Sequence, residues 1–305
     1  AIESFLSCDI RSELYRTDAI ALAAFYLAAK ADDLLDKINW AYVAGNTSEV
    51  PAFERQFLNL LAEADCLLES HPVFRLQRWV DLAERAGQSP EERDRFTGEL
   101  RRLVTVWGGP HLSDYSARVW SGLIRDYYLP RWEYYFIAKR TGGAFDFKHH
   151  DEWYHLARGI SHVTPHHDPL ASARRLVEHA SGIPSANDYR PADAVAFISP
   201  FEHLYERTRL TFSVRNADYR RAKAVRFRCT RGTETATIGN ILFRGHRENL
   251  SSYEVNRTIA AGEVVEVPIG DKRVHDALPQ EVTLQIEVRG HRALDNYISV
   301  ELVWE

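Results

Sequence analysis

Methionine is missing from the 305-residue sequence, and cysteine occurs three times. Cys8, Cys66 and Cys229 are far apart and odd in number, which excludes a disulfide framework or a zinc site of paired cysteines. We therefore expect buried free thiols, which behave as small core residues. The chain starts at Ala1 with no initiator Met and no signal peptide. It is expected to be a piece of a longer protein, a processed mature chain whose signal lay upstream, or a sequence whose Met positions were lost from the record.

Long apolar runs and blocks of one charge are also missing. No apolar stretch reaches the ~20 residues that cross a bilayer. The best candidate, residues 19–31, leads into Asp32 and Asp33, so we predict a buried helix and no membrane partner. The net charge of -5 comes without a basic block, which argues against nucleic acid as a partner. The content of 45% apolar and 27% charged residues is that of a soluble globular protein.

Complete catalytic motifs are missing as well. The sequence contains no nucleophile elbow, zinc-protease helix, phosphate-binding loop or dinucleotide fingerprint. Thirteen histidines are present, among them His149-His150, His162 and His166-His167. They have no carboxylate or thiol at ligand spacing, so we predict solvated or core-edge histidines, no metal site and no cofactor.

Helical periodicity dominates the first part of the chain. Apolar residues recur at helical spacing through residues 14–38 and again through 53–68. Ser89 and Pro90 are followed by Glu92, an order typical of a helix start with a capping box. The other predicted helices are residues 74–86 ending at Gly87, one that begins at Ser113 and is kinked or broken at Pro130, His150–Ser161, and Asp168–Ala180 with Asp168 as its cap.

The pattern changes after the linker-like stretch 182–191, where the period becomes two. Strands are predicted at Leu210–Val214, Ala224–Arg228, Thr235–Leu242, Ser252–Thr258, Glu263–Ile269, Val282–Val288 and Ile298–Trp304. The sequence thus predicts an all-α helical bundle domain, residues 1–185, followed by a small antiparallel β-sandwich, residues 193–305.

One segment, residues 104–136, is unusually rich in aromatic residues. It reads VTVWGGPHLSDYSARVWSGLIRDYYLPRWEYYF and holds eleven aromatics and prolines in 33 residues. Trp107 lies at a Gly-Gly-Pro turn after a helix, and Tyr115 lies in the first turn predicted next. Such rings can stack on the C–H faces of a sugar while a Tyr hydroxyl bonds its hydroxyls. For Trp107 and Tyr115 the sequence leaves two alternatives: they line a sugar cleft, or they pack in the core between helices. For the others we predict core: Val119, Trp120, Leu123, Ile124, Tyr127, Tyr128, Trp132 and Phe136.

The order of residues in this segment resembles the C-terminal helical region of the α-N-acetylglucosaminidases of glycoside hydrolase family 89. That family has a Trp-Gly-Pro turn, then Asp-Tyr at the start of a helix that continues through Gly-Leu and Tyr-Tyr pairs to Pro-Arg-Trp. The matching residues are Trp107-Gly108, Asp114-Tyr115, Gly122-Leu123, Tyr127-Tyr128 and Pro130-Arg131-Trp132. With Tyr15-Arg16-Thr17-Asp18 in the first helix, the resemblance covers about residues 10–180 and leaves out the β domain.

The sequence departs from the family pattern at two places. The turn after Trp107 is one residue shorter, and Gly109 stands before Pro110. The family's Thr-Arg-Gln in the first helix is Leu22-Ala23-Ala24 here, so any charge contact made by that arginine is missing.

The resemblance implies a retaining exo-hydrolase that releases terminal α-linked N-acetylglucosamine (GlcNAc) from glycans. Retention requires two carboxyl groups about 5–5.5 Å apart, which in the family are glutamates on an upstream (β/α)8 barrel. Strand–helix alternation is absent before residue 190, so we expect that barrel to be a partner outside this chain and assign no catalytic residue. Trp107, Leu112 and Tyr115 match family positions that line the sugar pocket, so the resemblance implies that they form part of its wall. The resemblance also implies an extracytoplasmic location (secreted, periplasmic or lysosome-like).

Two other functions fit a helical part followed by a β part. The first is a non-catalytic carbohydrate-binding or interaction module, with the β domain as the binding part. The second is a polysaccharide lyase with a helical toroid, although the helical part is short for a toroid.

Overall fold

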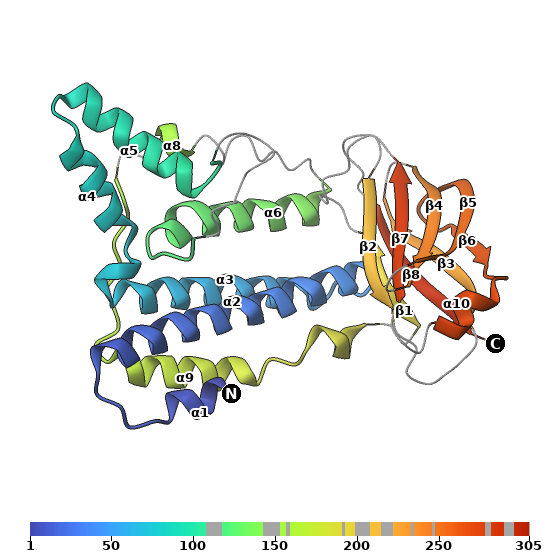
Figure 1. Cartoon of the computed structure of the whole chain (residues 1–305), viewed down its shortest axis with the longest axis horizontal. Coiled ribbons are helices and arrows are strands. Elements are labelled where there is room, and N and C mark those ends of the chain that lie inside the picture. The colour runs from blue at the N-terminus through green and yellow to red at the C-terminus, as the bar shows by residue number, and fades with distance from the viewer. Residues whose placement is uncertain are drawn as a thin grey trace. The chain divides into compact units, whose positions relative to one another are not determined.

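The structure is a computed structural model that describes residues 1–107, 118–142, 153–156, 159–190, 193–198, 208–214, 222–232, 235–245, 248–277, 282–289 and 296–304. Helices come first along the chain and antiparallel strands second, as the sequence predicts (Figure 1). The chain divides into two compact units. Ala1–Leu35 and Ala52–Ser185 form the helical unit, whereas Asp36–Pro51 and Ala186–Glu305 form the strand-containing unit. The division into domains 1–185 and 193–305 remains a prediction. In the described part of the chain, no helix is both long and apolar enough to span a membrane.

The helical unit consists of helices of very different length. Its long α2 and α3 extend into the segment 36–51, which is grouped with the strands. The elements are α1 (Ile2–Leu6), α2 (Glu13–Ala44), α3 (Val50–Glu69), the 3-10 turn η1 (Pro72–Phe74), α4 (Leu76–Ala86), α5 (Pro90–Val104), the π-helical turn η2 (Ile124–Tyr128), α6 (Leu129–Thr141), α8 (Trp153–Leu156) and α9 (Pro169–Ser181).

Side-chain caps start two of these helices as predicted. The Ser89 hydroxyl accepts a hydrogen bond from the Glu92 N–H at 3.2 Å at the start of α5. The Asp168 carboxylate accepts from two N–H groups in the first turn of α9, each at 3.1 Å. These bonds satisfy backbone donors that have no partner within the helix.

Aromatic and polar contacts hold the helices together. The Phe57 ring of α3 lies 4.9 Å from the Trp132 ring and 5.2 Å from the Phe136 ring, both on α6. The short α1 is tied to α9, because Arg174 donates to the Leu6 carbonyl at 2.6 Å. Packing of α3 against α6 places the end of α3 near the turn that precedes α6, which is the region of the candidate site (Figure 1).

Two helix predictions in this unit need correction. Residues 118–122 fall within the helix expected from Ser113 but are not helical, and the described helix begins at residue 123. At Pro130, where a kink or a break is predicted, the helix is not broken but continues as α6, and the π-helical turn η2 ends two residues before the proline. The helix expected at His150–Ser161 is limited to α8 in the described residues. At residue 161 the backbone N–H bonds to the Asp126 carboxylate at 2.8 Å, which a helical bond would exclude.

The strand-containing unit is a sandwich of two antiparallel four-stranded sheets, in the orders β1-β8-β3-β6 and β2-β7-β4-β5. The seven predicted strands are all present, whereas β1, the short helix α10 and the turn η3 were not predicted. The elements are η3 (Ala186–Tyr189), β1 (Ala194–Ile198), β2 (Thr208–Val214), β3 (Ala222–Arg231), β4 (Ala236–Arg244), β5 (Asn249–Ile259), β6 (Val264–Pro268), α10 (Lys272–Ala277), β7 (Val282–Arg289) and β8 (Tyr297–Trp304).

One apolar core lies between the two sheets. It contains Phe227 and Val300 from one sheet and Phe243 and Ile286 from the other, all fully buried. Alternation of inward and outward side chains along each strand produces this core, as the period of two predicts.

Aromatic residues of 36–51 pack against the strands of the same unit. The Trp40 ring meets the Phe197 ring of β1 edge-on at 4.8 Å. The Tyr42 ring stacks on the Tyr297 ring of β8 at 4.8 Å. The hydroxyl of Thr230 donates to the Tyr42 carbonyl at 3.3 Å. The sandwich is therefore built partly from residues far upstream in the sequence.

Candidate functional site

The candidate site is the aromatic segment 104–136 with the residues that hold it. Of the three residues assigned to the sugar pocket from the sequence, Trp107 is described, whereas Leu112 and Tyr115 lie outside the described residues. The structure therefore gives the geometry of Trp107 and of residues 118–136, and the pocket roles of all three stay predictions.

Trp107 lies just after the end of α5 and has an unusual backbone. Its φ is 53°, in the left-handed region, which it shares with only Asn256 among the non-glycine residues that the structure describes. The left-handed conformation costs a residue with a side chain about 1–2 kcal/mol. The residue is 38% exposed, so it is not enclosed in the helix core.

Residues 118–122 form an ordered turn because the start of α4 supplies partners for its backbone. Arg75 and Ser121 make a parallel β-bridge. The Ser121 N–H donates to the Phe74 carbonyl at 2.9 Å, and the Leu76 N–H donates to the Ser121 carbonyl at 3.0 Å. These bonds replace the helical ones, which explains why the helix begins later than the spacing of apolar residues indicates.

Gly122 ends this turn, and both its backbone and its surroundings require glycine. Its φ is 84°, and a Cβ at this position would lie 2.4 Å from the Cγ2 atom of Ile160. Ile160 is buried in the same apolar cluster as Leu123 and Tyr127. Any side chain at 122 would therefore both strain the backbone and collide with the core.

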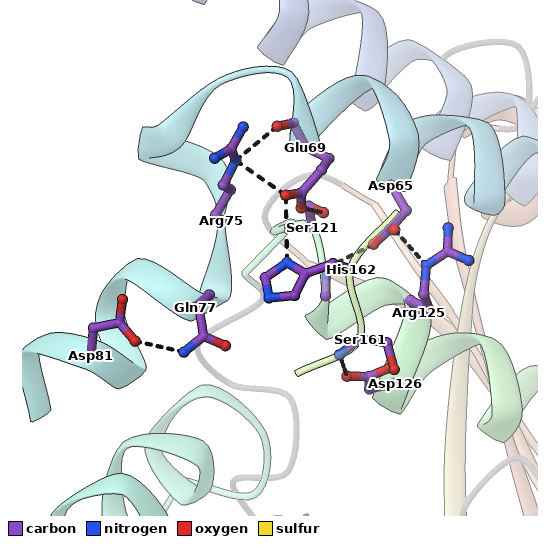
Figure 2. Close-up of polar contacts among 11 residues, drawn as sticks. Asp65, Glu69, Arg75, Gln77, Asp81, Ser121, Arg125, Asp126, Ser161 and His162 are labelled. Atoms are coloured by element: carbon purple, nitrogen blue, oxygen red, sulfur yellow. Dashed lines mark hydrogen bonds and ion pairs between the residues drawn. The ribbon is translucent and has the colours of Figure 1, made fainter. Parts of the chain in front are cut away.

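Two acidic residues one helical turn apart on α3 anchor this turn from the inside (Figure 2). Asp65 is fully buried and accepts the Gly122 N–H on one oxygen and the Arg125 guanidinium on the other, both at 2.9 Å. Burial raises the pKa of the Asp65 carboxyl, while the Gly122 N–H and the charge of Arg125 oppose this rise. The carboxylate thus fixes the start of the helix that carries the aromatic residues.

Glu69 joins three segments that are distant in the sequence (Figure 2). It accepts a hydrogen bond from the Ser121 hydroxyl. Its carboxylate lies 3.2 Å from Nε of Arg75 and 3.7 Å from Nδ1 of His162. Because Glu69 is also buried, these partners supply the charge and hydrogen bonds that such a group needs.

The remaining aromatic residues pack mainly on one another. Leu123, Ile124, Tyr127 and Phe136 are buried, which confirms the prediction of core residues for these four. Val119, Trp120, Tyr128 and Trp132 are half-buried. The Trp120 ring stacks on the Trp79 ring at 5.4 Å. The half-buried rings are therefore engaged with neighbouring rings of the same unit.

The acidic residues of this region differ in their surroundings. Asp65 and Glu69 are both committed to internal partners. Glu133 is exposed, and the other carboxylates considered from the sequence, Asp114 and Asp151-Glu152, lie outside the described residues. The described ranges bring together no group of three or more histidine, cysteine or acidic residues that could hold a metal ion.

The thiols differ from their expected environment. Cys229 is buried as predicted, but Cys8 is exposed and Cys66 is half-buried. Cys66 lies next to Asp65, and its sulfur is 3.7 Å from the Arg125 guanidinium. Burial raises the pKa of the Cys66 thiol despite that cation, so the thiol form is favoured there.

Sequence reasoning missed Asp65 and Glu69. It also missed Arg102, whose main-chain carbonyl and guanidinium both bond to the backbone of Trp107. The two acidic residues on α3 carried a signal, since they fall beside the predicted apolar face of that helix, where Ala64 and Leu68 are buried. Arg102 carried no such signal, because arginine is common on exposed helix surfaces.

Comparisons with known proteins cover the helical part of the chain. Residues 1–179 match the sequence model of the family described as "Alpha-N-acetylglucosaminidase (NAGLU) C-terminal domain". The human (Homo sapiens) α-N-acetylglucosaminidase is 34% identical over 80 residues, which are 26% of this chain and 11% of that protein.

Solved structures of a family 89 glycoside hydrolase from Clostridium perfringens are also similar. One, in complex with PUGNAc, has a TM-score of 0.50 and 26% identity, over 58% of this chain and 22% of that chain. Another, in complex with its substrate GlcNAc-α-1,4-galactose, has the same score and identity over 55% of this chain and 21% of its own. The chain therefore spans about one fifth or less of these relatives.

Proposed function

Because the chain belongs to the family of α-N-acetylglucosaminidase C-terminal domains, we propose that it forms the pocket-lining C-terminal part of an exo-acting, retaining α-N-acetylglucosaminidase. The substrate is a glycan that ends in α-linked GlcNAc. The catalytic glutamates belong to an upstream barrel domain, in keeping with the small share of its relatives that the chain spans. The enzyme acts outside the cytoplasm, as a secreted, periplasmic or lysosome-like protein.

The observation that carries this proposal is the geometry of Trp107. An exposed indole in a strained backbone conformation is costly to maintain, and such strain is typical of functional positions. The ring offers an apolar face to the C–H groups of a sugar. In this proposal Leu112 and Tyr115 belong to the same wall as Trp107. The wall excludes water from the pocket around the terminal sugar, while the barrel supplies the acid/base and the nucleophile.

The first test compares the chain alone with a longer protein that joins it to its upstream region. With 4-nitrophenyl α-N-acetylglucosaminide as substrate, we expect no release of nitrophenol from the 305-residue chain and hydrolysis by the longer protein. Hydrolysis by the chain alone would refute the assignment of the catalytic groups to another domain.

The second test substitutes the pocket residue in the longer protein. We expect Trp107→Ala to lower kcat/KM about 10- to 100-fold, because the contact between ring and sugar is lost and water enters the pocket. Each factor of ten corresponds to about 1.4 kcal/mol of lost transition-state stabilisation. The matched control is Tyr134→Ala, which removes a ring of similar exposure, 37%, on α6. Equal effects of the two substitutions would show that Trp107 has no special role in the pocket.

A further inference from the structure

Both backbone polar groups of Trp107 are bonded to one residue, Arg102. The Trp107 N–H donates to the main-chain carbonyl of Arg102 at 2.8 Å. The Trp107 carbonyl accepts a hydrogen bond from the Arg102 guanidinium. The two peptide groups on either side of the Trp107 α-carbon are therefore held at once, which fixes both backbone dihedrals of this residue.

The guanidinium is itself oriented by Glu99, one turn earlier on α5. Its Nε and one terminal nitrogen donate to the same Glu99 oxygen, at 2.9 and 2.7 Å. The other terminal nitrogen is the one that reaches Trp107. The rigid, planar guanidinium serves two acceptors at fixed directions, which a lysine ammonium on its flexible stem does less well.

Termination of α5 does not need this guanidinium. The Thr105 hydroxyl donates to the Arg101 carbonyl at 2.7 Å, and the Thr105 N–H donates to the Arg102 carbonyl at 3.2 Å. These bonds already occupy carbonyls of the last turn of the helix. The side-chain bond from Arg102 is additional, and it acts on Trp107, whose φ is positive.

We propose that Arg102, oriented by Glu99, is a positioning residue that holds Trp107 in its left-handed conformation and so sets the direction of the exposed indole. Its effect on catalysis rests on the proposed function, because it acts through the ring assigned to the sugar pocket. Its effect on the conformation of Trp107 does not depend on that function.

The conformational part is tested on the 305-residue chain labelled with 5-fluorotryptophan. Its seven tryptophans give separate ¹⁹F resonances, and Trp107→Phe identifies the one from Trp107. We expect Arg102→Ala to shift or broaden that resonance, Glu99→Gln to shift it less, and Arg102→Lys to restore it in part. Arg95→Ala, a change of another exposed arginine on α5, should leave it unchanged. An unchanged Trp107 resonance in Arg102→Ala would overturn the proposal.

The catalytic part is tested in the longer, active protein with the same nitrophenyl substrate. We expect Arg102→Ala to raise KM about three- to tenfold with a smaller change in kcat, because a misdirected ring weakens binding but leaves the reacting groups in place. Arg102→Lys should recover part of the loss, and Arg95→Ala should have wild-type constants. Glu99→Gln also guards against a folding defect, since it keeps Arg102 and should raise KM less.

The two hypotheses fail in different ways. If the Trp107 resonance moves but neither Arg102→Ala nor Trp107→Ala alters turnover, the positioning of Trp107 stands and the proposed function falls. If Trp107→Ala lowers kcat/KM while Arg102→Ala leaves KM unchanged, the function stands and the catalytic role of Arg102 is refuted.

Discussion

Single residues in this protein are constrained by backbone conformation as much as by side-chain chemistry. Gly122 and Trp107 both lie in the left-handed region, next to the ends of helical segments of the aromatic region. Glycine adopts this conformation readily, whereas tryptophan does so at a cost. The two positions therefore respond in opposite ways to a change of residue.

At Gly122 we expect alanine to destabilise the helical unit by about 3 kcal/mol, since backbone strain and the collision with Ile160 add. Gly142 is the matched control: its φ is 70°, but a Cβ at that position would meet nothing within 4 Å. Gly142→Ala should cost only about 1 kcal/mol. Urea unfolding of both variants measures the difference, and equal losses would contradict a steric role for Ile160.

At Trp107 we expect glycine to give a more stable protein than alanine, by about 1 kcal/mol, because both remove the ring and only glycine relieves the backbone. Leu82, exposed in the middle of α4, provides the control. There the order should reverse, with glycine about 1 kcal/mol less stable than alanine, as in any helix interior. The same order at both positions would mean that Trp107 is not strained in solution.

At the scale of elements, α3 supports the turn before α6 through its two buried carboxylates. Asp65 accepts from the Gly122 N–H of the turn and from Arg125 in η2, while Glu69 accepts from the Ser121 hydroxyl. The turn thus depends on contacts with residues more than fifty positions earlier in the sequence. The spacing of apolar residues in 113–130 predicts a continuous helix, because this local pattern contains no information about partners so distant in the sequence.

The raised pKa of Asp65 predicts a pH dependence of stability. Because the pKa of Asp65 is higher in the folded than in the unfolded protein, protonation of this group stabilises the fold. This stabilisation is fully present below the ordinary carboxyl pKa of 3.8 and is lost as the pH rises through the higher pKa of the folded state. The stability of the wild type relative to Asp65→Asn should therefore fall as the pH rises from about 4 towards neutrality. Urea midpoints of both proteins across that range measure it, and a difference that grows with pH would contradict the direction of the shift.

An element can be predicted from the sequence when residues within it or next to it determine its structure. Capped helices such as α5 and α9 and strands with clear alternation such as β7 are located from the sequence. Strand β1 reads AVAFI, without alternation of polar residues, and only its pairing with β8 identifies it. The glycine-rich neighbourhood of Trp107 predicts a turn at this residue, but its left-handed backbone and its bonds to Arg102 depend on the folded chain.

At the scale of the whole molecule, the strand-containing unit is not a continuous piece of sequence. Residues 36–51 belong to it, and Trp40 and Tyr42 of that segment are almost fully buried. Large aromatic residues in such positions contribute strongly to stability. The β part is therefore a poor candidate for a module that can be cut out at the linker.

We expect Trp40→Ala to destabilise the strand-containing unit by about 3–5 kcal/mol, the usual loss for a buried tryptophan. Phe25→Ala, on the same helix but 57% exposed, should change stability by no more than about 0.5 kcal/mol. Hydrogen exchange of the strand amides in the full chain measures the effect on this unit.

A fragment of residues 186–305 provides a second measurement. It should exchange its strand amides faster than the full chain and aggregate more readily, because the surfaces of Phe197 and Tyr297 are uncovered. Exchange at the rate of the full chain would contradict the role of residues 36–51.

The position of residues 36–51 in the chain also bears on synthesis in the cell. Trp40 and Tyr42 leave the ribosome long before the strands from Ala194 to Trp304 that cover them. Until β8 has been synthesised, these rings have no complete sheet to pack against, so the nascent chain presents an apolar surface on which chaperones can act. Completion of the sandwich therefore waits for its last strand, although it uses residues 36–51, which are synthesised before any of the strands.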